Sequence, residues 1–280
     1  MTSGENFPVG SVLIRRDLRG TVFDFYRFAR AADDVADATG LPPEEKLRLL
    51  DLFEAGLDGH PDGAPEGLAL HALPDPAPAR HARQLLRAFR RDARGGTCAT
   101  WDDLLAYCED SANPVGRFLL DLHGEGRGAW AMSDALCTAL QVLNHLQDLR
   151  ADHLGLRRHY LPADWLAEEG ATYGDLAALA LTPALRRAVD RALDRCDALL
   201  DGAAGLPGAL ASRRLAGEAA TILSLARALS ARLRRDDPLA GRVAPSRLDF
   251  ARAGLRGLGT VLGLRRRSAA GPVLLHREDA

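Results

Sequence analysis

The sequence predicts an all-α protein that folds as a single-domain helical bundle. Alanine, leucine and arginine dominate the composition, while aromatic residues make up only 5% and β-branched residues are few, a balance that favours helix over strand. Apolar residues recur at helical spacing along most of the chain, and no segment alternates with a period of two. No repeat or linker divides the sequence, so we expect one domain over residues 1–280.

Proline- and glycine-rich breaks divide the chain into its expected helices. Pro8 prevents a helix at the start, and the segments 58–67 and 74–78 are expected as loops. Thr100 suits the N-cap of a helix that opens at Trp101. The expected helices, in order, cover 11–18, 21–38, the stretch from Pro43, 79–93, the stretch from Trp101 with a kink at Pro114, 130–153, 163–169, 183–201, 207–234 and 245–264.

A row of polar side chains runs along the expected helix 130–153. Gln141, Asn144, Asp148 and Asp152 are spaced by three, four and four residues, so they fall within an arc of about 80° on one helix face. Apolar residues cover both flanks, so this row would be expensive to remove from water without a partner. Something cationic should lie opposite, and a hard divalent metal is the natural candidate.

A second acidic pair, Asp33 and Asp37, lies one turn apart in the expected helix 21–38, and Arg30 precedes it by three residues. Two helices with such pairs could face one another across a bundle and hold Mg²⁺. Because Mg²⁺ prefers a few carboxylates, several waters and substrate phosphate oxygens, the implied ligand is a diphosphate. Two solvated acidic patches remain the alternative for either pair alone. Their occurrence together favours the metal site.

The net charge of −2 argues against a nucleic-acid-binding protein. From Arg232 to the C-terminus, however, arginines outnumber acidic residues by eleven to five. Peripheral contact of this basic region with anionic lipid at the inner face of the membrane is one interpretation, and a solvated helical face is the one we favour. Since no signal peptide and no sufficiently long apolar run is found, we expect a cytoplasmic protein.

With both acidic helices identified, the sequence resembles the squalene/phytoene synthase family, the head-to-head prenyl synthases of the isoprenoid synthase fold. The resemblance covers nearly the whole chain. The matching positions are the family's Asp-x-x-x-Asp at Asp33 and Asp37, its Gln-x-x-Asn-x-x-x-Asp-x-x-x-Asp at Gln141, Asn144, Asp148 and Asp152, its Arg-x-Tyr-Leu-Pro at Arg158 to Pro162, and a tyrosine at Tyr107.

The resemblance implies a central active-site cavity in which Mg²⁺ and a prenyl diphosphate meet. The four aspartates are the expected metal ligands. Arg30 and Arg158 are expected to assist as diphosphate donors, although an ion pair between helices is an open alternative for each. The remaining residues expected to bind substrate are Gln141, Asn144, Tyr160 and Phe23, and the expected catalytic residues are Tyr107, Asn113, Asn144 and Arg30.

A carbocation formed in such a cavity needs dry, π-rich walls and controlled access of water. Phe23, Phe28 and Tyr107 are candidates for the walls, although ordinary core packing is the simpler interpretation of both phenylalanines. Asn113 could hold the quenching water; alternatively, it satisfies carbonyls freed by Pro114. His145 is expected to be a structural hydrogen-bonding residue.

Three stretches, at 5–9, 107–117 and 144–148, look like one branch of the family, the bacterial hydroxysqualene synthases of the hopanoid pathway. That resemblance implies a conversion of presqualene diphosphate and water to hydroxysqualene and diphosphate. Pathway enzymes upstream and downstream would supply the substrate and use the product. Since water replaces hydride in this reaction, no nicotinamide cofactor is expected.

Two departures from the wider family separate this site from enzymes that condense two prenyl diphosphates. The segment Ser111-Ala112-Asn113-Pro114 stands where many relatives have Val-Ala-Gly. Gln147 stands where carotenoid-forming relatives carry an arginine.

Alternatives from several classes stay open at this point. The nearest is a presqualene diphosphate or phytoene synthase that condenses two prenyl diphosphates. A chain-elongating prenyl transferase or a terpene cyclase would need a different second motif. A non-catalytic, lipid-binding family member should have lost metal carboxylates, and all four are present. A di-iron bundle is disfavoured because the sequence has no Glu-x-x-His pair.

Overall fold

In residues 15–263, which the computed structural model describes, the regular elements are helices, and a single bridge joins Thr97 and His159. Short 3₁₀ or π-helical pieces are labelled η. The elements are η1 (Arg16–Leu18), α1 (Arg19–Asp37), α2 (Pro43–Leu57), α3 (Pro65–His71), α4 (Ala77–Ala93), α5 (Trp101–Ser111), α6 (Asn113–Leu122), η2 (Arg127–Ala129), α7 (Trp130–Ala151), η3 (Asp152–Leu156), α8 (Ala163–Glu169), η4 (Tyr173–Ala177), α9 (Pro183–Gly202), α10 (Leu206–Ala209), α11 (Arg213–Leu233) and α12 (Arg247–Val261). The predicted all-α class is confirmed.

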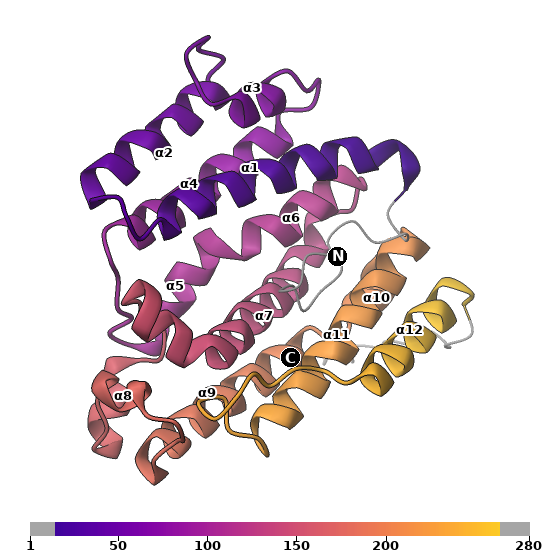
Figure 1. Cartoon of the computed structure of the whole chain (residues 1–280). Helices are drawn as coiled ribbons and strands as arrows, with labels where there is room; N and C mark the ends of the chain where they lie inside the picture. Colours follow the sequence, from indigo (N-terminus) through magenta and orange to yellow (C-terminus); the bar gives the residue numbers. More distant parts are fainter. Residues whose placement is uncertain (1–14, 264–280) are drawn as a thin grey trace, which may run out of the picture.

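The helices pack in a succession that Figure 1 shows from the indigo N-terminal helices to the yellow α12. α1 packs on α2, α3 and α4, and α4 packs on α6. α6 packs on α7, which in turn contacts α9 and α11, and α12 lies along α11. The helices that carry the two acidic pairs, α1 and α7, therefore belong to different parts of the bundle.

Two apolar cores hold this succession together. The N-terminal core joins α1 to α4 with α6, and Phe25 stacks on Phe118 with ring centroids 4.0 Å apart. The larger core joins α5, α7, α8, α9 and α11 around fully buried leucines such as Leu143 and Leu193. Because each acidic helix is anchored in its own core, the relative placement of the two pairs depends on how the cores meet.

Local side-chain signals explain where several helices begin. Thr100 accepts a hydrogen bond from the Asp103 backbone N–H at 3.2 Å, which confirms the predicted N-cap of α5. At the start of α12, Ser246 and Asp249 form a capping box. The predicted last helix, 245–264, is observed over Arg247–Val261.

Several predicted boundaries were wrong. The expected loop 58–67 includes the start of α3, where Pro65 occupies the first turn, a position that suits proline. The expected helix 207–234 is interrupted after α10, and Ser212 caps a new helix, α11. Pro114 does not kink a continuous helix. Instead, α5 ends at Ser111, and Pro114 lies in the first turn of α6.

The predicted helix 130–153 ends two residues early. α7 stops at Ala151, Asp152 opens the π-helical turn η3, and Arg157 then adopts a left-handed conformation with φ of 53°. Asp152 itself keeps helical dihedrals, and its backbone N–H donates to the Asp148 carbonyl, so it continues the polar row of the second motif. Widened turns of this kind are frequent at functional sites. The first motif lies as predicted on one helix, the observed α1.

Candidate active site

The first acidic pair is fastened to the loop that follows the second motif. Arg158 Nη1 donates to Asp37 Oδ1 at 2.5 Å, and Nη2 donates to the Ala36 carbonyl at 2.9 Å. The Arg158 side chain is only 6% exposed, whereas that of Asp37 is 37% exposed. Since Ala36 and Asp37 end α1, the guanidinium also caps the negative end of this helix.

Asp33 lies one turn earlier in α1, where its ionised carboxylate is destabilised. Burial, and then the neighbouring charge of Asp37, raises the pKa of Asp33 to about 7. Arg30 and Arg158 oppose this shift without cancelling it. The exposed guanidinium of Arg30 lies 2.8 Å from Asp34 and 3.6 Å from Asp33. Near neutral pH, this pair therefore carries less than its full negative charge until a cation arrives.

The second motif follows the polar side of α7 and continues into η3. Gln141, Asn144 and Asp148 are half-buried on α7, and Asp152 begins η3. Burial raises the pKa of Asp148, the charge of Asp152 raises it further, and the charge of Arg242 opposes the shift. The two carboxylates of this motif therefore influence one another, as those of the first motif do.

His145 lies inside this motif and takes part in it more fully than expected. Its Nε2 hydrogen-bonds the amide of Gln141 at 3.0 Å, and its Nδ1 lies 3.8 Å from Asp152 Oδ2. The ring stacks on Tyr160 with centroids 3.5 Å apart. The predicted hydrogen-bonding role of His145 is confirmed, and the stacking adds a contact between α7 and the loop before α8.

A buried carboxylate that sequence reasoning missed lies at the centre of these residues. Asp92, near the end of α4, accepts hydrogen bonds from Tyr107 at 2.8 Å and from Tyr160 at 3.1 Å. Burial raises the pKa of Asp92, while the positive charge of Arg158 opposes that shift. A signal was available, because Asp92 stands four residues after the buried Ala88 on the mostly apolar buried face of α4.

A continuous set of polar side chains thus connects the two acidic motifs. Arg158 pairs with Asp37 and stabilises the Asp92 anion by its charge. Asp92 holds Tyr160, and Tyr160 stacks on the His145 ring that faces Asp152. The structure therefore brings together residues that are widely separated in the sequence, from α1, α4, α7, η3 and the loop before α8.

The donor set fits Mg²⁺ better than a closed structural metal site. No three His, Cys, Asp or Glu side chains gather as a ready-made metal site anywhere in residues 15–263. Each motif offers two carboxylates, and the first pair, with the pKa of Asp33 raised to about 7, has an unmet demand for positive charge. Magnesium suits such incomplete oxygen sites because it keeps waters and substrate oxygens as its other ligands. Its presence here stays a prediction.

Asn113 is buried at the start of α6 and contacts α7. Its amide oxygen accepts a hydrogen bond from the Thr138 hydroxyl at 3.0 Å. Thr138 is also buried and lies one turn before Gln141, so it extends the polar row of the second motif towards Asn113. The predicted role of Asn113 as a water ligand stays a prediction.

The candidate aromatic walls differ from one another in the structure. Phe28 is fully buried and meets Phe53 edge-on, so it is a core residue, as the simpler interpretation held. Phe23 is 59% exposed, and the Arg27 guanidinium carbon lies 6.0 Å from its ring centroid. Tyr107 is buried beside Asp92.

Gln147, the second expected departure from the wider family, has a structural partner. Its buried amide donates a hydrogen bond to the backbone carbonyl of Val243. Val243 belongs to the segment that joins α11 to α12. Gln147 therefore ties the second motif to the segment that leads into α12.

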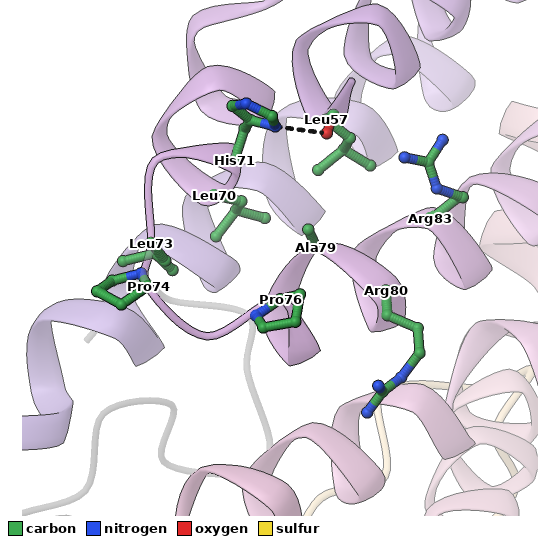
Figure 2. Close-up of a pocket in the computed structure, with 9 residues that line it drawn as sticks. All are labelled: Leu57, Leu70, His71, Leu73, Pro74, Pro76, Ala79, Arg80 and Arg83. Atoms are coloured by element: carbon green, nitrogen blue, oxygen red, sulfur yellow. Dashed lines mark hydrogen bonds between the residues drawn. The ribbon is translucent and has the colours of Figure 1, made fainter. Parts of the chain in front are cut away.

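Two pockets are informative about the predicted cavity. A pocket of about 390 Å³ lies between α2, α3 and α4, as Figure 2 shows, and no predicted site residue lines it. A void of only about 10 Å³ lies beside His145 and Tyr160. Since neither pocket is lined by an aspartate of either motif, a cavity lined by both pairs stays a prediction.

Comparison with known proteins now decides the family. A family model for squalene/phytoene synthase matches residues 1–249. The chain belongs to this family. It is 42% identical to the hydroxysqualene synthase of Zymomonas mobilis over 245 residues, which cover 85% of this chain and 82% of the relative. It is 40% identical to that of Sinorhizobium fredii over 269 residues, which cover 95% and 91%.

Solved structures of a squalene synthase and a dehydrosqualene synthase have the same fold. The squalene synthase HpnC from Alicyclobacillus acidocaldarius matches with a TM-score of 0.69 and 34% identity, over 81% of this chain and 87% of that one. A dehydrosqualene synthase solved with a ligand matches with a TM-score of 0.74 over 93% of both chains, and its 19% identity supports the fold alone. The predicted family and isoprenoid synthase fold are confirmed.

The basic C-terminal region is only partly within the described residues, and the stretch 5–9 that supported the branch resemblance lies outside them. Among the helices of residues 15–263, none has both the length and the apolar composition required to cross a bilayer.

Proposed function

We propose that this chain is a hydroxysqualene synthase, which converts presqualene diphosphate and water to hydroxysqualene and diphosphate. The observation that carries this proposal is the contrast between two groups of relatives. Three hydroxysqualene synthases are 40–42% identical over 85–96% of the chain. Phytoene synthases, which represent the condensing alternative, are 30–33% identical over 69–73%. The site departures at residues 111–114 and at Gln147 favour the same choice.

Diphosphate departure in an apolar site requires neutralisation of the leaving group, and Mg²⁺ held by Asp33, Asp37, Asp148 and Asp152 would supply that charge. Within the chain itself, Arg158 fixes the Asp37 carboxylate and keeps it at the end of α1. Arg30 is exposed and pairs at 2.8 Å with the equally exposed Asp34, so it can reorient towards a diphosphate at small cost.

Tyr107 and Tyr160 are suited to face a carbocation without reacting with it. Both hydroxyls donate to Asp92, and burial raises the pKa of both phenols, so they remain neutral. A neutral phenol whose O–H is hydrogen-bonded to a carboxylate can stabilise a cation through the electrons of its ring and oxygen. It is nevertheless a poor nucleophile. Asp92 thereby acts as a positioning residue for both rings.

Water has to reach the cation once, and Asn113 is proposed to place it. The Thr138 hydroxyl occupies the amide oxygen of Asn113, so the amide N–H group is the part that remains to hold a water molecule. We further propose a cytoplasmic enzyme that receives its substrate from an upstream prenyl-condensing enzyme and passes its product to enzymes that act on hydroxysqualene.

The test is to supply presqualene diphosphate and farnesyl diphosphate separately, with Mg²⁺ and without NADPH, and to identify the products by mass spectrometry. Presqualene diphosphate should give hydroxysqualene that carries oxygen from isotopically labelled water. Farnesyl diphosphate alone should give little product. Efficient formation of phytoene-type hydrocarbon or presqualene diphosphate from two prenyl diphosphates would instead establish the condensing alternative.

A further inference from the structure

One side of α12 exposes a stripe of leucines to solvent. At 100° per residue, the four side chains fall within an arc of about 80° on the helix. Their exposed fractions are 56% for Leu248, 71% for Leu255, 52% for Leu258 and 58% for Leu262. Scattered exposed leucines are ordinary on a protein surface, but an aligned set on one helix face indicates an interaction surface.

The opposite side of α12 is packed tightly on α11, which fixes the direction of the stripe. Gly257 lies against Gly217 and Thr221 of α11, and a Cβ atom at Gly257 would lie 2.8 Å from the Gly217 carbonyl oxygen. Ala253, on the same side, is fully buried. Figure 1 shows α12 alongside α11 at the end of the succession of helices. The leucine stripe therefore points away from the bundle.

Arginines flank the leucine stripe. Arg247, Arg252 and Arg256 are exposed, and within residues 15–263 none of them has an ion-pair partner. The only acid of α12, Asp249, pairs with Arg232 of α11 instead. Within the described residues, this face of α12 is therefore both apolar and uncompensated in charge.

We propose that α12 docks on the membrane surface, with the leucine stripe in the headgroup–acyl boundary and the three arginines on anionic phospholipid headgroups. A helix with one apolar face and basic flanks has the chemistry of an interfacial helix. Anionic headgroups supply the negative charge that residues 15–263 do not provide at Arg247, Arg252 and Arg256. This docking goes beyond the proposed reaction and does not depend on it.

Charge also argues against the other occupants of this face. A symmetric dimer through α12 would bring the arginines of two copies together, and like charges at an interface are repulsive. The sequence from residue 264 to the C-terminus carries four arginines against two acidic residues, so its net charge is also positive. An anionic lipid surface is the occupant that both buries the leucine stripe and neutralises the arginines beside it.

The docking helix is also connected to the active site. Gln147 of α7 donates to the carbonyl of Val243, four residues before α12. Gln147 is next to Asp148 in the second acidic motif. The segment that leads into the docking helix is therefore tied directly to the second acidic motif.

The test is sedimentation of the full chain with vesicles of phosphatidylcholine, with and without phosphatidylglycerol. We expect binding to the anionic vesicles that weakens as salt rises. Combining Leu255→Asp with Leu258→Asp should lower the partition coefficient by at least about a hundredfold. Arg252→Ala and Arg256→Ala should each lower it roughly fivefold. The matched control is Leu179→Asp, since Leu179 is 72% exposed but lies outside α12.

Three results would overturn membrane docking. The first is that the full chain does not bind anionic vesicles, or that Leu179→Asp weakens binding as much as the α12 variants. The second is a dimer in solution that Leu255→Asp dissociates, which would make a second copy the occupant. The third is a loss of thermal stability in Leu255→Asp, which would show that the chain covers its own stripe. Turnover of detergent-dispersed substrate should be unchanged in the α12 variants, so a failure of docking is distinct from a failure of the proposed reaction.

Discussion

The two acidic motifs share a position in their helices but differ in how the protein compensates their charge. Asp33 and Asp37 occupy the last turns of α1, where the buried Arg158 pairs with Asp37 and the pKa of Asp33 is raised to about 7. Asp148 and Asp152 lie where α7 ends and η3 begins, among an amide, an imidazole and the more distant charge of Arg242. The protein thus fixes one carboxylate of the first motif with a buried cation.

Both positions are unfavourable for carboxylates, and this is what the comparison teaches. The C-terminal end of a helix carries partial negative charge, so aspartates there reduce stability. Two such pairs in one chain, each with a carboxylate whose pKa is raised, are difficult to explain by folding alone. Local rules are broken in this way where function requires it. A cation that binds both motifs would relieve the unfavourable charge in each.

The largest expected effect comes from removing one carboxylate of either motif. Asp33→Asn and Asp148→Asn should each lower turnover by about a thousandfold or more, because stabilisation of the leaving diphosphate is worth several kcal/mol. The thermal midpoint should stay constant or rise, since each change relieves repulsion at a helix end. Steady-state kinetics and circular dichroism measure both quantities.

Asp34→Asn is the matched control for these two variants. Asp34 neighbours Asp33 on α1, but its side chain is 58% exposed and pairs with Arg30 at the surface. Its loss should leave turnover within about threefold of the wild type. Equal damage from Asp34→Asn and Asp33→Asn would show that the effect is a general property of the acidic surface.

Arg158 tests whether a buried cation stabilises the first acidic motif. Arg158→Ala removes the partner of Asp37 and the donor to the Ala36 carbonyl, so we expect a loss of about 2–4 kcal/mol in unfolding free energy. Arg30→Ala, which removes an exposed pair, should cost less than about 0.5 kcal/mol. Denaturant unfolding of both variants decides this, and similar losses would contradict the distinction between a buried and a surface arginine.

Asp92 tests the connection between the motifs. Asp92→Asn retains one side-chain oxygen as an acceptor for the two tyrosine hydroxyls, so we expect kcat to fall about tenfold with little change in KM. Because the amide nitrogen replaces the acceptor of one tyrosine hydroxyl and the charge opposite Arg158 is lost, unfolding free energy should fall by about 1–3 kcal/mol. A large rise in KM at constant kcat would indicate a role in substrate binding instead of ring positioning.

The pH dependence should report Asp33. Burial raises its pKa to about 7 from the usual 3.8, so a proton has to leave before the first motif can bind a cation fully. We expect kcat/KM to rise with pH through about 7. The metal-free folded protein binds more protons than the unfolded chain between these two values, so its unfolding free energy should fall as pH rises across that range.

Asp33→Asn is the control for the second half of this prediction, since it should remove that component of the stability profile. Guanidinium unfolding at several pH values measures the profile directly. A profile that Asp33→Asn leaves unchanged would mean that another group titrates.

The smallest expected effect concerns product choice. Asn113→Gly removes the amide proposed to place the quenching water, and it also removes the acceptor for Thr138. Products should shift from the alcohol towards eliminated hydrocarbons while substrate consumption continues. Thr138→Val is the companion variant, since it removes only the hydroxyl that orients the amide, and its shift should be smaller. An unchanged product ratio in Asn113→Gly would remove Asn113 from the mechanism.

The features that the sequence could predict are local ones. Helical periodicity located α1 and α7, and the Asp-x-x-x-Asp spacing identified both motifs. The Thr100 cap was also readable, because capping depends on neighbouring residues. The break at Ser212 was missed although Ser212 has the same capping chemistry, since the apolar pattern continues on both sides of it.

The features that could not be predicted depend on contacts between distant residues. Arg158 and Asp37 are 121 positions apart, and periodicity within one helix contains no information about such a pair. Asp92 was hidden for the same reason, since its partners Tyr107 and Tyr160 come from other elements. The π-helical turn at Asp152 was hidden because helical propensity does not distinguish it from a continuing α-helix.

The central claim is that the two acidic motifs bind one metal–diphosphate unit together. Calorimetric titration of inorganic diphosphate into the wild type, Asp33→Asn and Asp148→Asn, each with and without Mg²⁺, tests it most directly. We predict that diphosphate binds the wild type only with Mg²⁺, and that either substitution lowers the affinity at least about tenfold. Equal affinity in Asp148→Asn and the wild type, or equal binding with and without Mg²⁺, would contradict the claim.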